Sequence, residues 1–319
     1  MAADTLLTAV RAHLKLDPGH SVILEPIKRG ASGRTIVRLK AEGHPSFIGI
    51  HYTLDRKDNR YFLPVARFLK KAKLNVPEVL YDNPGRNIAL VEDLGEVDLL
   101  SIADQPWEER EPYYRSALEQ LDRLFYTRPP KDLELSPAFG AETYEWEQEY
   151  FIDNFVETHL GLDGTAMRSD QHLIKLRENL GASHRNLIHR DFQSQNIILH
   201  EGNAWIIDFQ GLRLGRQEYD LASLIYDPYL NHSEEEHEKL LAIWEDISEE
   251  RPVPELLRDC AIQRLMQALG AYANILHNQT IDWYAQHIPT GARLLLTQIE
   301  GTQYEPSLRP ILEKALEDD

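Results

Sequence analysis

Residues 189–196 read His-Arg-Asp-Phe-Gln-Ser-Gln-Asn, and residues 208–210 read Asp-Phe-Gln. Between these stretches the chain reads as a strand, a turn and a second strand, so polar residues crowd both ends of a predicted hairpin. The asparagine five residues after Asp191 can bring an amide oxygen beside that carboxylate, and Asp208 can add a second carboxylate. Mg²⁺ prefers oxygen ligands of these kinds. We therefore expect the chemistry of this protein at the two ends of the hairpin.

Apart from this hairpin, the chain divides into a strand-rich part and a helical part. Extended runs in the first 95 residues predict five strands, at 21–28, 34–40, 46–52, 76–82 and 87–94. Helices are expected at 4–14 and at 59–71, where Phe62, Val65 and Leu69 recur at helical spacing. Further helices are expected at 111–126, 144–160, 169–179, 234–247, 254–277 and 291–300. The pattern predicts a small antiparallel sheet followed by a large helical part.

Composition excludes several classes of protein. The net charge of −18 argues against a nucleic-acid partner, because phosphate backbones are bound by clustered Lys and Arg, and it mildly favours a cationic substrate. No apolar run approaches the roughly 20 residues that span a bilayer, and the N-terminal residues do not resemble a secretory signal. The single cysteine, Cys260, excludes an intrachain disulfide and is expected in a buried helix. We expect a cytoplasmic protein with no membrane partner.

The two polar stretches resemble motifs of a known family. HRDFQSQN resembles the H-x-D-x-x-x-x-N loop of protein kinases and their small-molecule relatives, and IIDFQ at 206–210 stands where kinases have Asp-Phe-Gly. The glutamine in that motif and the stretch YDLASL at 219–224 are similar to the aminoglycoside phosphotransferase and choline kinase group. The resemblance implies an α+β, bilobal, protein-kinase-like fold. Its small antiparallel-sheet N-lobe would span residues 1–95, and its large helical C-lobe residues 96–319.

The resemblance implies ATP and Mg²⁺ as cofactors and assigns roles to individual residues. Asp191 would accept or orient the proton of the substrate hydroxyl, and Asn196 and Asp208 would bind Mg²⁺. His189 and Asp220 would support the catalytic loop.

The same resemblance implies where the nucleotide lies. The backbone at Glu92 and Leu94 resembles the hinge that holds adenine. Gly30, Ser32 and Gly33 stand between two predicted strands, where kinase relatives cover the phosphates, and glycine lets backbone N–H groups approach a phosphate closely. Taken alone, this stretch is equally typical of a hairpin turn.

One feature departs from the kinase pattern. Kinases place a lysine on the third strand, paired with a glutamate on the next helix. Here Ile50 or His51 occupies the lysine's place, and residues 58–72 contain no glutamate. The lysine and the glutamate are expected to be absent together, because either one alone would be a buried unpaired charge. Arg29, Arg34 and His51 are candidates to hold the phosphates instead.

In this departure the chain resembles the N-acetylmuramate/N-acetylglucosamine kinases, which often lack the strand lysine. These kinases phosphorylate amino sugars at the anomeric hydroxyl during cell-wall recycling. The stretches that carry the resemblance are NVPEVLYD (75–82), LVEDLG (90–95), HRDFQSQN (189–196), DFQGLRLG (208–215), YDLASL (219–224) and AIQRLMQALGAYA (261–273).

The acceptor site is expected in the helical part. Glu149, within an acidic and aromatic stretch at 144–155, can bind hydroxyl or ammonium groups, although such a stretch is also typical of a solvated helix face. Gln263 and Arg264 follow from the resemblance. Arg264 can pair with a carboxylate such as the lactyl group of muramic acid, or can form an ordinary surface ion pair.

Three functions remain open at this level. The first is an amino-sugar kinase acting on the anomeric hydroxyl of N-acetylmuramate or N-acetylglucosamine, with a small-molecule sugar as its only implied partner. The second is an aminoglycoside or other cationic-alcohol phosphotransferase, which the acidic composition favours. The third is a nucleotide-binding regulator without turnover.

Overall fold

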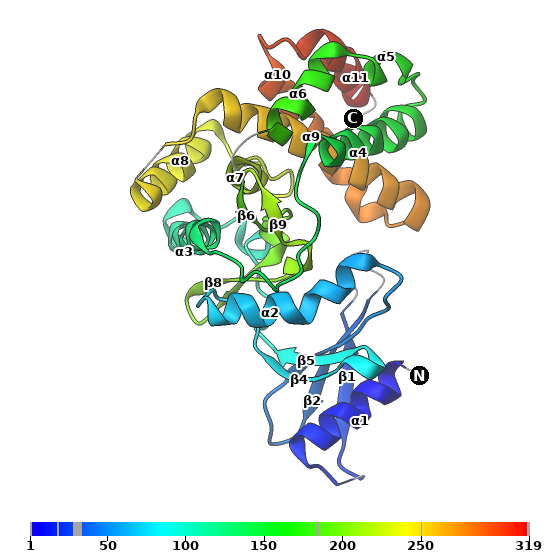
Figure 1. Ribbon diagram of the computed structural model, residues 1–319, viewed down its shortest axis with the longest axis vertical. Coiled ribbons are helices and arrows are strands. Elements are labelled where there is room, and N and C mark those ends of the chain that lie inside the picture. The colour runs from blue at the N-terminus through cyan, green and yellow to red at the C-terminus, as the bar shows by residue number, and fades with distance from the viewer. Residues whose placement is uncertain (1, 18, 28–33, 183–184, 250, 318–319) are drawn as a thin grey trace.

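A five-stranded antiparallel sheet, in the order β1-β2-β3-β5-β4, forms the N-terminal lobe (Figure 1). The computed structural model describes residues 2–17, 19–27, 34–182, 185–249 and 251–317. The strands are β1 (Val22–Pro26), β2 (Thr35–Ala41), β3 (Phe47–His51), β4 (Val79–Asn83) and β5 (Ile88–Glu92). Each of the five extended runs in the sequence forms one of these strands.

The two faces of the sheet pack against different parts of the molecule. Helix α1 (Ala2–Leu14) covers one face, where Leu6 and Val10 join a small core. Gly49 of β3 allows this close packing, because a Cβ at that position would lie 2.7 Å from Leu39 Cδ1. The other face joins the main core together with α2 (Phe62–Lys71), which follows the 3₁₀ turn η1 (Lys57–Tyr61). The predicted apolar stripe of α2 is buried as expected.

The helical lobe contains α3 (Trp107–Tyr126), α4 (Ala141–Phe151), α5 (Thr165–Arg168), α6 (Gln171–Ala182), α7 (Gln217–Ile225), α8 (Glu234–Ser248), α9 (Pro254–Gln279), α10 (Ile288–Ile299) and α11 (Glu305–Leu316). The six helices expected from the sequence are all present, although the one expected at 144–160 is α4 continued by a π-helix, η4 (Ile152–His159). The remaining three were not predicted. In the described part of the chain, no helix is both long enough and apolar enough to cross a bilayer.

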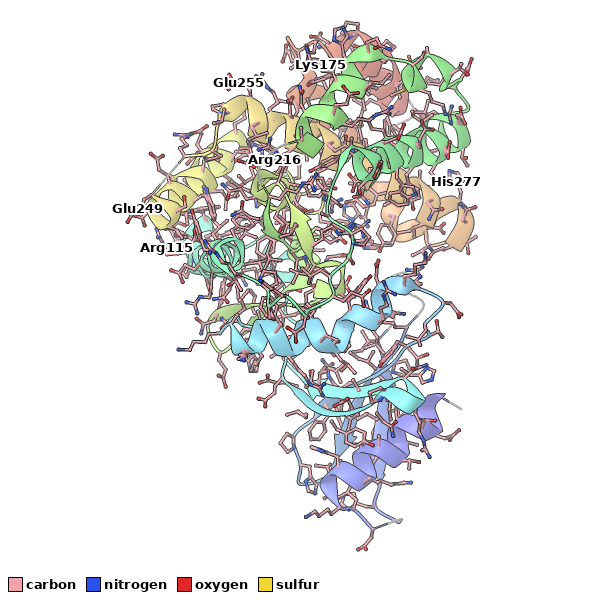
Figure 2. All side chains as sticks on the ribbon, in the orientation of Figure 1. Arg115, Lys175, Arg216, Glu249, Glu255 and His277 are labelled. Atoms are coloured by element: carbon pink, nitrogen blue, oxygen red, sulfur yellow. The ribbon has the colours of Figure 1, made fainter. Side chains whose placement is uncertain are left out.

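Helix α9 is the central element of this lobe and contacts α4, α7 and α10 (Figure 1). Its crossing with α4 is close, since a Cβ at Gly270 would lie 2.9 Å from the backbone Cα of Phe151. Cys260 is fully buried in the same helix, as the sequence indicates. Charged side chains such as Lys175, Glu249 and Glu255 extend outward from the helical lobe, where they remain solvated (Figure 2).

Two short antiparallel ladders hold the polar stretches that were expected to carry the chemistry. Strand β6 (Asn186–Ile188) pairs with β9 (Arg213–Gly215), and β7 (Ile197–His200) pairs with β8 (Asn203–Ile206). The second ladder is the hairpin predicted from the sequence. Because β6 leads into the first polar stretch and β9 follows the second, the two ladders fix both stretches at one edge of the helical lobe.

Candidate active site

A cleft of about 700 Å³ lies between the sheet and the helical lobe. The sheet contributes an apolar wall that includes Ile36, Ile48 and Ile50, and the segment after β5 contributes residues 92–96. The loop before β7, the turn after β8 and helix α9 line the opposite side. The sequence-predicted residues brought together on this lining are Arg34, Glu92, Leu94, Asp191, Asn196, Asp208 and Arg264.

The loop that carries Asp191 is held from below by Asp220 of α7. The Asp220 carboxylate accepts hydrogen bonds from the backbone N–H groups of His189 (2.5 Å) and Arg190 (2.8 Å). These bonds hold Arg190 at φ 82°, a left-handed conformation that non-glycine residues seldom adopt. His189 is buried and its Nε2 donates to the carbonyl oxygen of Ile207 (2.9 Å), which links the two polar stretches. Burial raises the pKa of Asp220 to about 7, although the two backbone donors oppose that rise.

The electrostatic surroundings of Asp191 keep its carboxylate ionised. Burial alone would raise its pKa, but the positive charges of Arg190 and Arg264 outweigh burial and lower the pKa below its ordinary value. Arg264 Nη2 lies 3.8 Å from Asp191 Oδ1. An ionised carboxylate that lines a cleft can accept a proton from a bound hydroxyl group.

Asn196 and Asp208 lie on either side of the hairpin and both line the cleft. The side-chain N–H of Asn196 donates to the backbone carbonyl of Asp191 (2.9 Å), so the amide oxygen is the atom that Asn196 can offer to a metal. Asp208 adopts a left-handed conformation, φ 63°, at the start of the 3₁₀ turn η6 (Phe209–Gly211). Its side chain is 36% exposed and forms an ion pair with Arg34. One amide and one carboxylate oxygen on a solvent-accessible cleft form a donor set that suits Mg²⁺.

The aromatic residue after Asp208 ties this turn to the sheet lobe. The ring of Phe209 stacks on Phe62 at the start of α2, with centroids 5.8 Å apart and planes 6° apart. Both rings are buried. The contact fixes the position of Asp208 relative to the opposite wall of the cleft.

The predicted adenine hinge lies where the chain leaves β5. The side chain of Glu92 turns away to Lys70 (3.6 Å) and accepts a hydrogen bond from the backbone N–H of Glu78 (3.1 Å). The carbonyl oxygen of Leu94 accepts a hydrogen bond from His200 Nδ1 (3.1 Å). The backbone N–H of Glu92 donates to the carbonyl oxygen of Glu78 (2.9 Å), so both the side chain and the N–H of Glu92 contact neighbouring protein groups.

Arg38 is a cleft residue that the sequence reasoning missed. It projects from β2, is buried, and pairs with Asp93 through Nε–Oδ2 (2.6 Å) and Nη2–Oδ1 (3.0 Å). Its guanidinium also donates to the carbonyl oxygen of Gly95 (3.0 Å) and contacts Glu96. Burial would raise the pKa of Asp93, but hydrogen bonds from Arg38, Ser46 and Gly95 lower it. The sequence does hold a signal for Arg38, because it is a charged residue on the same strand face as Ile36.

The place of the kinase lysine is apolar in this chain. Ile48 and Ile50 line the cleft, so Ile50 is the strand residue on the side where a lysine would meet phosphates. His51 pairs across the sheet with Ile88, whose side chain belongs to the core under α1. Because paired residues share a face of a sheet, His51 faces away from the cleft. Gly30, Ser32, Gly33 and Arg29 lie outside the described residues.

A model of the phosphotransferase enzyme family (APH) matches residues 23–257, about three quarters of the sequence. The chain belongs to the phosphotransferase enzyme family. It is therefore a phosphotransferase that acts on a hydroxyl acceptor, and the cleft that contains Asp191 is its candidate active site.

Two relatives match most of this phosphotransferase. It is 28% identical over 244 residues to the N-acetylmuramate/N-acetylglucosamine kinase of Neisseria meningitidis serogroup B, which covers 71% of this chain and 72% of the relative. It is 25% identical over 293 residues to the protein of the same name in Pseudomonas aeruginosa, covering 86% of this chain and 83% of the relative.

Solved structures confirm the fold. The choline kinase LicA from Streptococcus pneumoniae superposes with a TM-score of 0.66 at 14% identity, covering 93% of the phosphotransferase and 100% of LicA. The ADP-bound aminoglycoside phosphotransferase APH(2'')-Ib gives a TM-score of 0.57 at 16% identity, covering 91% and 97%. The bilobal protein-kinase-like fold expected from the motifs is therefore confirmed.

Of the three acceptor-site candidates in the phosphotransferase, Arg264 is the one that lines the cleft. Its guanidinium is held by three neighbours: Nε donates to Ser223 Oγ (3.0 Å), Nη2 donates to Gln193 Oε1 (2.8 Å), and Nη1 contacts Gln267. These contacts place its charge beside Asp191, on the part of the cleft that α9 lines.

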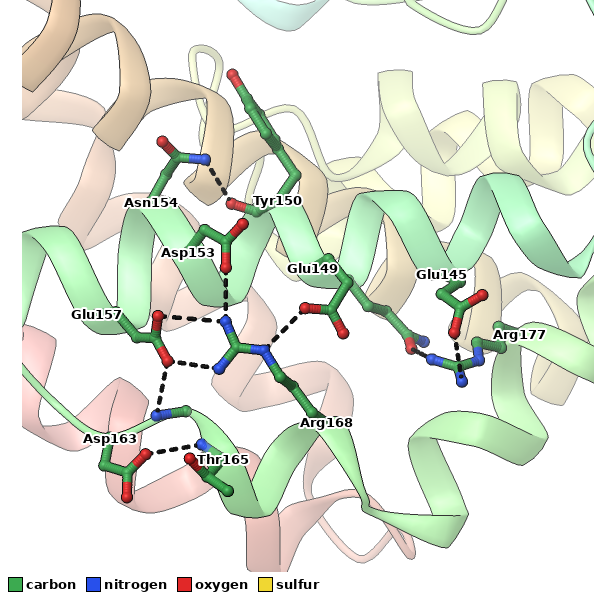
Figure 3. A network of polar contacts seen from close by, with 12 residues as sticks. Glu145, Glu149, Tyr150, Asp153, Asn154, Glu157, Asp163, Thr165, Arg168 and Arg177 are labelled. Atoms are coloured by element: carbon green, nitrogen blue, oxygen red, sulfur yellow. Dashed lines mark hydrogen bonds and ion pairs between the residues drawn. The ribbon is translucent and has the colours of Figure 1, made fainter.

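The other two candidates lie elsewhere. Gln263 is fully buried behind Arg264, where its amide N–H groups donate to Tyr144 O (3.1 Å) and Glu147 Oε2 (3.2 Å). Glu149 accepts a hydrogen bond from Arg168 Nε (2.9 Å) within a network of acidic side chains around that arginine (Figure 3). Neither residue is on the cleft lining, because the period of α4 and α9 turns both side chains to other neighbours.

The aromatic residues at the acceptor end were not expected. Tyr229, Tyr272 and Tyr284 line the cleft near Arg264. The ring of Tyr272 lies 5.4 Å from that of Tyr229 and 5.7 Å from that of Tyr284, measured between centroids. The three come from the segment after α7, from α9 and from the turn before α10. The three tyrosines are far apart in the sequence, so they could not be recognised as a group. Tyr272 was the most accessible of them to prediction, because it stands two helical turns after Arg264 on α9.

Proposed function

We propose that this phosphotransferase transfers the γ-phosphoryl group of ATP to the anomeric hydroxyl of an amino sugar, N-acetylmuramate or N-acetylglucosamine, in cell-wall sugar recycling. The observation that carries the proposal is a single cleft lined by an ionised Asp191, by the oxygen-bearing side chains of Asn196 and Asp208, and by Arg264 with three tyrosines. The similarity to two N-acetylmuramate/N-acetylglucosamine kinases supports the sugar class.

The residues of the cleft fit a nucleotide bound with Mg²⁺. The backbone between Glu92 and Leu94 would hold the adenine, and the oxygens of Asn196 and Asp208 would hold the metal. Bound there, Mg²⁺ would neutralise charge on the transferring phosphoryl group. The apolar wall of Ile48 and Ile50 would cover the nucleotide and exclude water from it.

Asp191 would accept the proton of the acceptor hydroxyl. An anomeric hydroxyl is more acidic than an ordinary alcohol, because the ring oxygen withdraws electron density, so the carboxylate has an easier proton to remove. Arg190 and Arg264 keep Asp191 ionised before the reaction. The remaining lowering of the barrier would come from positioning and electrostatic stabilisation.

The acceptor end is better suited to a sugar than to a cation. Tyrosine rings can stack on the apolar face of a sugar, and they can also contact a quaternary ammonium group. The guanidinium of Arg264 lies 3.8 Å from Asp191, so a cationic acceptor would bring like charges together there. A sugar acid such as N-acetylmuramate would instead gain from this positive charge. A cationic alcohol is the second candidate, favoured by the three tyrosines and by the net charge of −18.

A panel of acceptors tests the proposal. Purified protein, ATP and Mg²⁺ would be incubated with N-acetylmuramate, N-acetylglucosamine, glucose, an aminoglycoside and choline, and ADP formation measured. We expect turnover with the two amino sugars and none above background with choline. An Asp191→Asn protein serves as the matched control for contaminating kinases. Turnover confined to choline or the aminoglycoside would reject the sugar assignment.

A further inference from the structure

We infer that Arg34 takes the role of the absent strand lysine and binds the phosphates of the nucleotide. The inference rests on the proposed function, since it concerns the nucleotide of the same cleft. It assigns one residue of this chain to a task that the apolar position Ile50 cannot perform.

The position of Arg34 is the first observation. It directly precedes β2, at the end of the sheet that overhangs the cleft, and lines the cleft with its side chain only 5% exposed. Its guanidinium forms an ion pair with Asp208, and Nη1 donates to Gln210 Oε1 (3.1 Å). The charge of Arg34 therefore lies next to the carboxylate proposed to bind the metal, where the phosphates of a metal–nucleotide complex must lie.

Among the described residues, four other arginines line the cleft, namely Arg38, Arg56, Arg190 and Arg264, and the surroundings of Arg38 and Arg264 are the second observation. Arg38 is bound to Asp93 and the carbonyl of Gly95, beside the adenine hinge. Arg264 is bound to Ser223 and Gln193 at the acceptor end. Within the described cleft lining, Arg34 is the arginine paired with Asp208.

The glutamine of the Asp-Phe-Gln motif completes the arrangement. Gln210 Nε2 donates to Asp208 Oδ1 (3.0 Å), while Gln210 Oε1 accepts from Arg34. The side chain thus bridges the cation and the carboxylate, and glycine at this position offers no such bridge. The ion pair with Asp208 neutralises a nearly buried guanidinium, whose burial would otherwise be costly. When Asp208 binds a metal, phosphate oxygens would neutralise the guanidinium of Arg34 in its place.

Binding measurements without acceptor test the inference. The dissociation constants of adenosine and ADP would be measured by calorimetry in the presence of Mg²⁺ for wild type, Arg34→Gln and Arg34→Lys. We expect Arg34→Gln to weaken ADP tenfold or more while changing adenosine less than twofold, because the lost contacts are charge-assisted hydrogen bonds to phosphate. Arg34→Lys should recover part of the loss. Thermal melts of each variant report folding.

Variants of other residues test the competing assignments of the phosphate ligand. His51→Gln should leave both ligands unchanged, because His51 faces away from the cleft. Arg29→Gln and Arg56→Gln test two other arginines, and an ADP-specific loss in either, with none in Arg34→Gln, would overturn the inference. Equal or tighter ADP binding by Arg34→Gln would also overturn it, since Arg34 would then only compete for Asp208. Failure of the wild type to bind ADP would instead reject the proposed function.

Discussion

Asp191 combines three local properties that suit a catalytic base. It follows a residue in a left-handed conformation, its loop is fixed by Asp220, and two arginines keep it ionised. Asparagine preserves the shape of the side chain and removes its capacity to accept a proton.

We expect Asp191→Asn to lower kcat by roughly 10²–10⁴, the usual range for a positioned acid–base group, with folding and ADP binding retained. Initial rates at saturating ATP and sugar would measure the change, with calorimetry for ADP as the control. Near-normal turnover by the folded variant would remove Asp191 from the mechanism.

Asp208 is a second single residue with a role of its own, the proposed binding of Mg²⁺. We expect Asp208→Ala to abolish Mg²⁺-supported turnover, and Asn196→Ala to raise the Mg²⁺ concentration required for half-maximal activity, because each removes one proposed oxygen ligand. Rates measured across a Mg²⁺ titration give both results. Asp208→Asn, which keeps the side-chain size beside Arg34, controls for loss of packing. An active Asp208→Ala protein with the wild-type Mg²⁺ requirement would contradict the metal assignment.

At the scale of single elements, a buried histidine joins three helices of the C-terminal lobe. His232 follows α7. Its Nε2 accepts a hydrogen bond from the hydroxyl of Tyr114 of α3 (2.7 Å), while Nδ1 donates to Ile225 O at the end of α7 (3.0 Å). The next residue, Ser233, caps α8. Burial lowers the pKa of His232 to about 4, because the charged imidazole is poorly solvated there.

This histidine makes the stability of the lobe sensitive to acid. An unfolded histidine titrates near pH 6.5, so between that pH and about 4 the unfolded chain binds a proton that the folded protein excludes. The stabilising contribution is present above pH 6.5 and falls by about 3 kcal/mol as the pH approaches 4. Urea unfolding of wild type and His232→Gln at pH 7.5, 6 and 5 would measure it. We expect the stability gap between the two proteins to narrow with falling pH, and parallel curves would exclude this role.

Elements differ in how well the sequence predicts them. The β7–β8 hairpin and α2 were predicted because their turn residues and apolar spacing are local signals. Helix α7 was missed because residues 218–225 are all buried, which removes the periodic contrast between apolar and polar faces. Helix α11 was missed because Pro306 and Pro310 read as loop residues. The π-helical continuation of α4 has no distinguishing signal in the residue pattern.

At the scale of the whole molecule, the polar residues of the candidate active site were predictable and the walls of the cleft were not. Asp191, Asn196 and Asp208 lie within eighteen residues of one another in a recognisable spacing. The pairs that shape the cleft join distant parts of the chain, as Arg38 joins Asp93 and Arg34 joins Asp208. Helical period alone could not tell that Arg264 faces the cleft and Gln263 the core. The division at residue 95 stays a prediction.

If the cleft phosphorylates an amino sugar at its anomeric hydroxyl, the position of the new phosphate is the most direct test. N-acetylmuramate and N-acetylglucosamine would each be converted with ATP and Mg²⁺, and the products examined by ³¹P and ¹H NMR without purification. We expect a phosphorus signal coupled to the anomeric proton, together with loss of the reducing end. A phosphorus signal coupled instead to the protons at carbon 6, on a sugar that keeps its reducing end, would contradict it.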